Sequence, residues 1–374
     1  MRALAGIRVV ELARVLAGPW CGMTLADLGA EVIKIEPPEG DDTRGWGPPF
    51  KDGLSAYFAC CNRNKRSIAL NLRDPATRPA LEALVRQADV VIENYRTGGA
   101  EKLGVGYEQL RALNPRLVYC SISGYGRDGP QADRPGYDFA IQAEAGLMAL
   151  TGPVGGEPYR VGTPVADITA GNNAAMAVLA ALFHRERTGE GQKIEISLFD
   201  SQLQLLANSA SGALFTGQDA KRLGNQHPNI VPYQVFAAND AHFVLAVASE
   251  TLWRKLCAAL DISEWLADPR FVNNAARVQN RNELIVLLSA RFASQPLAHW
   301  QNVFENAQIP MAAINTVKQA IDHPVAERMR IEVEGVAMRA SPLRLSATPP
   351  RYQLPPPKLD AHRAEILAEL GLSP

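Results

Sequence analysis

The segment from Arg160 to Gly171 contains a single acid, Asp167, among small and apolar residues. A carboxylate in such surroundings can act as a nucleophile. The proline at 164 predicts extended backbone before the acid, and the Ala-rich run 172–187, which two glycines follow, predicts a helix. Asp167 therefore belongs at or near a helix N-terminus, whose partial positive charge favours an ionised carboxylate. A purely structural role as a helix N-cap fits the same position.

The bulk composition narrows the possible functions. The chain has 374 residues, of which 47% are hydrophobic and 21% charged, which is ordinary for a soluble globular protein and enough for two or three domains. The formal net charge of -1 gives no electrostatic bias toward nucleic acid or anionic membranes. The first residues lack the apolar stretch of a secretory signal, and no apolar run approaches transmembrane length. We therefore expect neither a nucleic-acid nor a membrane partner.

The 5 cysteines are scattered, odd in number and without the spacing of metal ligands. Free thiols of this kind are typical of a reducing compartment. We therefore expect a cytoplasmic protein with no metal site.

Strand patterns alternate with helix patterns over the first 200 residues or so, which predicts a doubly wound α/β domain. The first turn, residues 14–19, lacks the G-x-G-x-x-G spacing that lets a backbone approach a pyrophosphate, so we exclude a dinucleotide site. The expected strands are 7–13, 31–36, 67–72, 90–95, 117–122 and 193–198, and the expected helices are 20–28, 75–88, 137–150 and the long run after the acid.

The pattern changes after about residue 220. Two paired strands, 231–236 and 242–247, precede three helical patterns at 250–260, 281–292 and 297–307. We predict a large α/β domain over 1–200, a linker over 201–224, a smaller α+β domain over 225–330, and an extended Pro-rich arm with a C-terminal helix over 331–374 that returns to the large domain.

Several segments, in order along essentially the whole chain, resemble the class III CoA-transferases, the family of formyl-CoA transferase and carnitine CoA-transferase. They are Leu16–Pro19, Asp27–Glu36, Asn64–Ile68, Glu93–Tyr95, Arg134–Asp138 and the stretch around Asp167. Two longer segments, Gly40–Phe50 and Ile230–Gln234, are most similar to the succinyl-CoA:glutarate subgroup. The resemblance implies a Rossmann-like large domain without dinucleotide binding, a smaller inserted domain, and a homodimer whose two chains interlock.

The resemblance places Asp167 at the position of the catalytic aspartate. Attack of its carboxylate on an acyl-CoA thioester gives a mixed anhydride and frees the CoA thiolate, which then attacks the aspartyl carbonyl to give an enzyme-bound thioester. The incoming acid repeats these steps in reverse. We therefore expect CoA to move from an acyl-CoA donor such as succinyl-CoA to a carboxylic acid acceptor such as a dicarboxylate, in a site closed to water.

The resemblance also assigns positions to CoA, the expected cofactor in the form of acyl-CoA. Arg73 and Lys102 keep the family's charges while exchanging lysine and arginine, and a solvated element end is the alternative for both. Leu16 replaces a glutamine of formyl-CoA transferase, which argues against oxalate chemistry. The full set of positions is Val15, Leu16, Ala17, Leu70, Arg73, Asn94, Lys102 and Tyr137.

Two further features concern the substrate and the lid. The segment Gly224-Asn225-Gln226-His227 aligns with the glycine-rich loop that covers the active site of formyl-CoA transferase, although it has one glycine instead of a run. His227 is either a polar lid residue or a turn residue. Arg44 is the candidate cation for the distal carboxylate of a dicarboxylate, and a surface pair with Asp41 or Asp42 is the alternative.

Two other functions were weighed. α-Methylacyl-CoA racemase shares the fold, but Tyr137 stands where it has a histidine, and tyrosine is a poor proton acceptor near neutral pH. A catalytically silent CoA-binding protein is the second alternative, against which the intact Asp167 argues. A serine hydrolase is disfavoured because we find no G-x-S-x-G segment.

Overall fold

The computed structural model describes residues 2–373, which form two compact units. The large unit contains the described residues up to Met148, then Arg160–Ala220, and the chain from Val325 onward. The small unit contains Ala149–Tyr159 and Lys221–Pro324. The segment 149–159, which the sequence placed in the large domain, thus belongs to the small unit.

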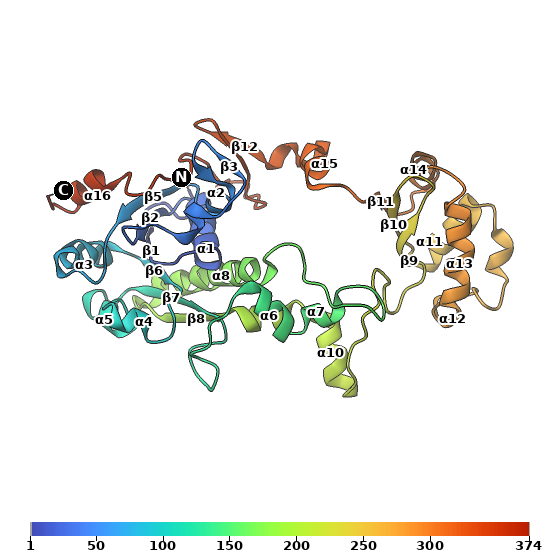
Figure 1. Cartoon of the computed structure of the whole chain (residues 1–374), viewed down its shortest axis with the longest axis horizontal. Helices are drawn as coiled ribbons and strands as arrows, with labels where there is room; N and C mark the ends of the chain where they lie inside the picture. The colour runs from blue at the N-terminus through green and yellow to red at the C-terminus, as the bar shows by residue number, and fades with distance from the viewer. Residues whose placement is uncertain (1, 374) are drawn as a thin grey trace. The chain divides into compact units, whose positions relative to one another are not determined.

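A six-stranded parallel sheet forms the centre of the large unit, with the strand order β5-β2-β1-β6-β7-β8 (Figure 1). The parallel α/β class predicted from the sequence is confirmed. From β1 the chain adds strands first on one side and then on the other, so the strand order reverses between β1 and β6. The strands are β1 (Arg8–Glu11), β2 (Glu31–Glu36), β5 (Lys65–Ala69), β6 (Val90–Glu93), β7 (Val118–Ser123) and β8 (Lys193–Ser197).

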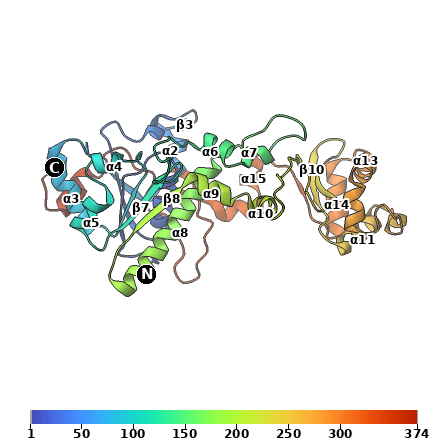
Figure 2. The same cartoon turned by 90° about the horizontal axis from the view of Figure 1, so that it is seen from below.

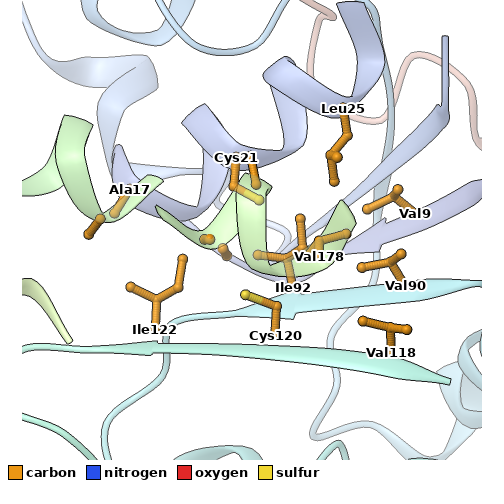
Figure 3. Packing of buried hydrophobic residues seen from close by; sticks show 14 of the residues in the cluster. Val9, Ala17, Cys21, Leu25, Val90, Ile92, Val118, Cys120, Ile122 and Val178 are labelled. Atoms are coloured by element: carbon orange, nitrogen blue, oxygen red, sulfur yellow. The ribbon is translucent and has the colours of Figure 1, made fainter. Parts of the chain in front are cut away.

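Helices α1 (Ala17–Asp27) and α8 (Val165–Thr188) cover one face of this sheet. Figure 3 shows Cys21 and Leu25 of α1 and Val178 of α8 above strand residues such as Ile92 and Cys120. Small residues let the two helices approach closely: a Cβ at Gly171 would lie 2.7 Å from the carbonyl oxygen of Ala17. The Ala-rich composition of α8 is therefore a requirement of packing.

The opposite face is covered by α3 (Arg78–Gln87), α4 (Gly99–Lys102), α5 (Tyr107–Leu113) and the C-terminal α16 (Arg363–Glu369) (Figure 2). Leu81 and Leu84 of α3 pack with Ile366 of α16 and with the strands. Helices on both faces bury both sides of the sheet, which explains the nearly continuous apolar runs of its central strands.

Helix α8 corrects one expectation. By length and composition it could cross a membrane, whereas the sequence showed us no apolar run of that length. Ala170, Ala174 and Val178 of this helix are fully buried in the core cluster against the sheet. Buried core helices of soluble proteins have the same length and apolar composition, so one such helix is only weak evidence for a membrane span.

The small unit contains an antiparallel sheet with the order β11-β10-β9, and helices pack against it. Its core is aromatic: the ring of Phe292 meets those of Phe236, Phe243 and Trp300 edge-on at centroid distances of 5.0 to 5.4 Å. Its elements are β9 (Tyr233–Ala237), β10 (His242–Ala246), β11 (Met311–Ala313), α11 (Glu250–Ala259), α12 (Asn274–Gln279), α13 (Arg281–Phe292), α14 (Leu297–Asn306), α15 (Val317–Asp322) and η3 (Ser263–Leu266).

Shorter elements complete the two units. Helices α9 and α10 occupy much of the segment 201–224 that the sequence assigned to a linker. The remaining elements are η1 (Asp42–Gly45), β3 (Phe50–Lys51), β4 (Leu54–Ser55), α2 (Ala56–Ala59), η2 (Pro75–Thr77), α6 (Asp138–Glu144), α7 (Leu147–Leu150), α9 (Leu198–Gln204), α10 (Ala207–Thr216), η4 (Pro324–Met329), β12 (Arg330–Val333) and β13 (Val336–Arg339).

A buried ionic cluster lies at the carboxyl end of β1. Glu11 is fully buried, and its Oε1 accepts hydrogen bonds from Nζ of Lys34 at 3.1 Å and from Nζ of Lys65 at 3.0 Å. The two ammonium groups also donate to the carbonyl oxygens of Ala13 and Pro19, at 2.8 and 2.9 Å. Buried charges are tolerated when they are paired and hydrogen-bonded in this way.

Gly22 of α1 provides the space for this cluster, since a Cβ there would lie 1.9 Å from Oε2 of Glu11. We expect Gly22→Ala to lower the free energy of unfolding by roughly 2–3 kcal/mol, because the carboxylate must move away from its lysines. Urea denaturation measures this change. Gly45→Ala, where a Cβ meets nothing within 4 Å, should change stability by less than about 0.5 kcal/mol. Equal effects of the two substitutions would contradict the assignment.

Candidate active site

A cavity of about 190 Å³ opens at the carboxyl ends of β1, β6 and β7 in the large unit. In open parallel sheets, ligands bind at the carboxyl edge where the strand order reverses, and that reversal lies between β1 and β6. We call this cavity the switch-point cleft. Its lining comes from the loops after the three strands, chiefly Arg14–Ala17, Asn94–Thr97 and Ala132–Tyr137, and from Asp167.

Asp167 is the third residue of α8, and the N-cap of that helix is Pro164. In the described part of the chain its half-buried carboxylate accepts no hydrogen bond. The N-cap role considered from the sequence is therefore wrong for Asp167. Its carboxylate is instead available to a ligand in the cleft.

Asp138 performs the capping. Its Oδ1 accepts the backbone N–H of Ala166 at 2.8 Å, which satisfies one of the unpaired donors in the first turn of α8. Its Oδ2 accepts the side-chain amide of Gln142 at 2.7 Å, and Oε1 of Gln142 accepts the N–H of Val161 at 2.9 Å. Asp138 and Gln142 together fix the segment that leads into Asp167.

The electrostatic surroundings raise the pKa of Asp167 to about 7. Burial is the larger cause and the negative charge of Asp138 the second. The helix N-terminus was expected to favour the ionised acid, whereas burial and the like charge of Asp138 favour the protonated form. Near neutral pH this carboxyl group exists in both protonation states, and the nucleophilic form gains population as the pH rises.

The loop after β1 has a strained conformation. Val15 has a φ of 69°, in the left-handed region that β-branched residues rarely adopt. Its N–H donates to the buried carboxylate of Asp41 at 3.2 Å. Asn94, which follows β6, accepts the N–H of Arg14 at 3.0 Å and donates to its carbonyl oxygen at 2.7 Å. These bonds hold the loop against the cleft, so Asn94 acts by positioning Arg14 and Val15.

Five of the eight positions predicted to meet CoA line the cleft. Leu70 is buried in the core, and Arg73 and Lys102 are exposed. These three residues do not line the cleft, so their contact with CoA stays a prediction. The five that line it are Val15, Leu16, Ala17, Asn94 and Tyr137.

Arg44 is not in the cleft lining. Its Nε and Nη2 each bind a carboxylate oxygen of Glu36 at 2.7 Å, and Nη1 donates to the carbonyl oxygen of Pro357 at 3.0 Å. The guanidinium carbon also lies 3.9 Å from the ring centroid of Phe58. A bidentate pair with Glu36 therefore occupies Arg44 in this structure, and its role as the substrate cation stays a prediction. Its partner is not Asp41 or Asp42, as the alternative supposed.

The predicted lid, Gly224-Asn225-Gln226-His227, belongs to the small unit. The N–H of His227 donates to the carbonyl oxygen of Tyr233 at 3.0 Å, and its Nδ1 accepts the N–H of Asn229 at 3.1 Å. The imidazole also packs on the ring of Tyr233 at a centroid distance of 5.1 Å. These contacts are those of a turn residue, and the lid role stays a prediction.

The sequence reading missed the arginines of the cleft. Arg127 is bound to Glu93 at 2.9 Å, and Arg134 is paired with Glu144. Arg96 is exposed, and the exposed Arg14 makes a pair with Asp42 at 3.2 Å. Arg14 and Arg96 are therefore the cleft cations that an anionic ligand can use. Their places directly after β1 and β6 are the signal that could have identified them.

Comparisons with known proteins agree with the geometry. Residues 4–363 match the family described as CoA-transferase family III. The chain is 43% identical to succinate–glutarate CoA-transferase of Agrobacterium fabrum, over 98% of this chain and 95% of the relative. It is 41% identical to succinyl-CoA:glutarate CoA-transferase of Mus musculus, over 99% of this chain and 87% of the relative. A crystal structure of a CAIB/BAIF family protein from Brucella suis is 45% identical, with a TM-score of 0.91, and the match covers 99% of this chain and 100% of that one.

The raised pKa of Asp167 can be tested through Asp138. The substitution Asp138→Asn removes a negative charge but keeps an oxygen that can accept the N–H of Ala166, so the pKa of Asp167 should fall by roughly one unit. Carboxyl carbon NMR of aspartate-labelled protein measures both titrations, and Asp167→Asn identifies the resonance by its loss. An unchanged titration in Asp138→Asn would mean that burial alone sets the value.

The same shift predicts a stability effect of Asp167→Asn. The folded chain holds the Asp167 proton up to a pH of about 7, whereas an unfolded chain releases it near 3.9. The folded state therefore loses stability as the pH rises between these values. Asp167→Asn should raise the Tm by a few degrees at pH 8 and by nothing at pH 3.5, as seen by calorimetry. A gain that is independent of pH would contradict this explanation.

Proposed function

The chain belongs to CoA-transferase family III and is an enzyme that moves CoA from an acyl-CoA to a carboxylic acid, and we propose that the donor is succinyl-CoA and the acceptor a dicarboxylic acid. Succinate and glutarate in the names of the relatives from Agrobacterium fabrum and Mus musculus support this choice. The observation that carries the catalytic assignment is the position of Asp167 at the carboxyl edge of the sheet, where its carboxylate accepts no hydrogen bond from residues 2–373.

The ionised carboxylate of Asp167 attacks the thioester carbonyl, and the C–S bond breaks to release CoA thiolate. The thiolate attacks the aspartyl carbonyl of the resulting anhydride, which gives an aspartyl-CoA thioester and frees the first acid. The acceptor carboxylate then attacks this thioester, and the released thiolate attacks the acceptor's acyl carbonyl, which regenerates Asp167. The resting carboxylate accepts no hydrogen bond from the described residues, so its lone pairs are free for attack.

The N-terminus of α1 supplies donors for this reaction. Leu16 is the N-cap and Ala17 the first residue of this helix, and both line the cleft. The first N–H groups of a helix have no partners within it, so these backbone donors suit the oxyanion of each tetrahedral step. Arg14 and Arg96 in the same lining suit the phosphates of CoA.

A homodimer and a cytoplasmic location belong to the same proposal. Helix α10 has no buried residue, and its Leu214 and Phe215 are 84% and 90% exposed. Helix α8 exposes Met176 and Phe183. Large apolar side chains with this exposure favour a covered surface, which a second copy of the chain would provide. All five cysteines are free thiols, in keeping with a reducing compartment.

Racemase chemistry has no observation in its favour. Both carboxylate oxygens of Asp138, the acid that follows Tyr137, accept hydrogen bonds from Ala166 and Gln142. They are therefore engaged in structural contacts. The experiment that separates the two reactions follows both labels: transfer of CoA between two isotopically labelled acids, and entry of solvent deuterium at Cα.

Asp167→Ala should reduce CoA transfer from succinyl-CoA to glutarate by about 1000-fold or more, because the nucleophile itself is lost. In the parent enzyme, hydroxylamine added with succinyl-CoA should leave a hydroxamate on Asp167 that mass spectrometry detects. The parent's kcat/KM should rise with pH through about 7, where the acid ionises. Asp133→Asn, which changes an exposed acid of the cleft lining, serves as the matched control. Full turnover in Asp167→Ala, with folding intact, would refute the assignment.

A further inference from the structure

Arg339 lies close to α8, the helix that carries Asp167, on the side of that helix that α1 covers. Arg339 is the last residue of β13, and its guanidinium carbon lies 4.2 Å from the ring centroid of Trp20. The indole N–H of Trp20 donates to Oδ1 of Asn172 on α8 at 2.9 Å. Trp20 thus connects Arg339 to the helix that carries Asp167.

The contact with α8 is one turn from the nucleophile. Gly171 follows Asp167 by four residues, so the two share a helix face at a rise of about 6 Å. A Cβ at Gly171 would lie 3.0 Å from Cβ and 3.1 Å from Cδ1 of Trp20. The indole therefore packs on α8 at Gly171 and Asn172, about one turn from Asp167, and Arg339 lies over that indole.

The charge of Arg339 is not matched by an acid. The neighbouring Arg63 is paired with an acid, because its Nε and Nη2 bind the two carboxylate oxygens of Asp27. Arg339 makes one long bond, from Nη1 to the carbonyl oxygen of Ala340 at 3.4 Å, and its buried Nη2 has no partner in the described part of the chain. Burial and the charge of Arg63 lower the pKa of Arg339. A half-buried cation in this state gains most from an incoming anion.

Aromatic side chains occupy the same neighbourhood. Tyr57 of α2 packs edge-on against Trp46 at a centroid distance of 5.0 Å. Burial raises the pKa of Tyr57, and so do the charges of Asp167 and Cys60. The charge of Arg339 in turn contributes to lowering the pKa of the Cys60 thiol. Tyr57 therefore lies within electrostatic range of Asp167, and α2 borders both the nucleophile and the arginine.

We propose that Arg339 binds the distal carboxylate of the dicarboxylic acyl group and so selects dicarboxylic over monocarboxylic substrates. The proposal rests on the proposed function. The thioester carbonyl meets Asp167, the methylenes of a short chain lie along Trp20, and the far carboxylate meets the unpaired guanidinium. A monocarboxylic acyl group would leave this cation without an anion. Arg44, the cation expected from the sequence, is held by Glu36, and Arg14 and Arg96 lie in the cleft lining with the proposed phosphate contacts. Arg339 lies outside that lining and approaches α8 through Trp20.

The test compares two donors that differ at one end of the acyl chain. Succinyl-CoA and butyryl-CoA have the same four-carbon chain, with a carboxylate in the first where the second has a methyl group. The rate of acylation of Asp167 by each donor gives a selectivity ratio, the kcat/KM for succinyl-CoA divided by that for butyryl-CoA. Arg339→Met should lower this ratio by about 10- to 100-fold, and Arg339→Lys should restore part of it.

Arg96→Ala is the matched control, because loss of a phosphate contact should slow both donors and leave the ratio unchanged. Tm values and far-ultraviolet circular dichroism establish that each variant is folded. Equal losses with both donors in Arg339→Met and Arg339→Lys would overturn the inference and leave Arg339 as a packing residue on Trp20. A parent enzyme that transfers CoA from butyryl-CoA but not from succinyl-CoA would overturn the proposed donor as well, which distinguishes the two failures.

Discussion

The site depends on a buried ionic cluster at the end of the first strand. Lys34 is buried, and its Nζ lies within 3.1 Å of carboxylate oxygens of Glu11 and Asp41 and donates to the carbonyl oxygen of Ala13. Burial alone would lower the pKa of Lys34, but the surrounding carboxylates raise it. Asp41 in turn holds the N–H of Val15 in its strained conformation. A charge buried inside the sheet thereby fixes a backbone loop at the surface, and removing any partner would leave an uncompensated charge.

A second carboxylate, that of Asp138, likewise binds a backbone N–H group and so positions the segment that contains Asp167. Asp138 closes the first turn of α8 and fixes the preceding segment. Its negative charge contributes to the raised pKa of Asp167. One side chain thus supplies both geometry and electrostatics. Ionisation of Asp167 near neutral pH lowers the free energy of unfolding. Such a loss of stability is typical of active sites.

Whether an arginine is paired with an acid of the chain decides whether it stabilises the fold or is available to a ligand. Arg44 and Arg63 face acids that match their geometry, Glu36 and Asp27, and they serve the fold. Arg96 and Arg339 lack such acids among the residues described. An arginine without an acid near a substrate site is a place where ligand charge can contribute binding free energy. The choice between structural and ligand-binding cations therefore follows from the tertiary contacts.

The sequence by itself determined the parallel α/β class, because alternating strand and helix periods are local. It also determined that Asp167 begins a long helix and that residues 15–17 follow the first strand. The tertiary structure decided the rest. The pKa of Asp167 depends on Asp138, which is 29 positions away in the chain, and the pairing of Arg339 with Trp20 joins residues 319 positions apart. Charges and stacking act through space over a few ångströms, so their outcome depends on which distant segments the fold brings together.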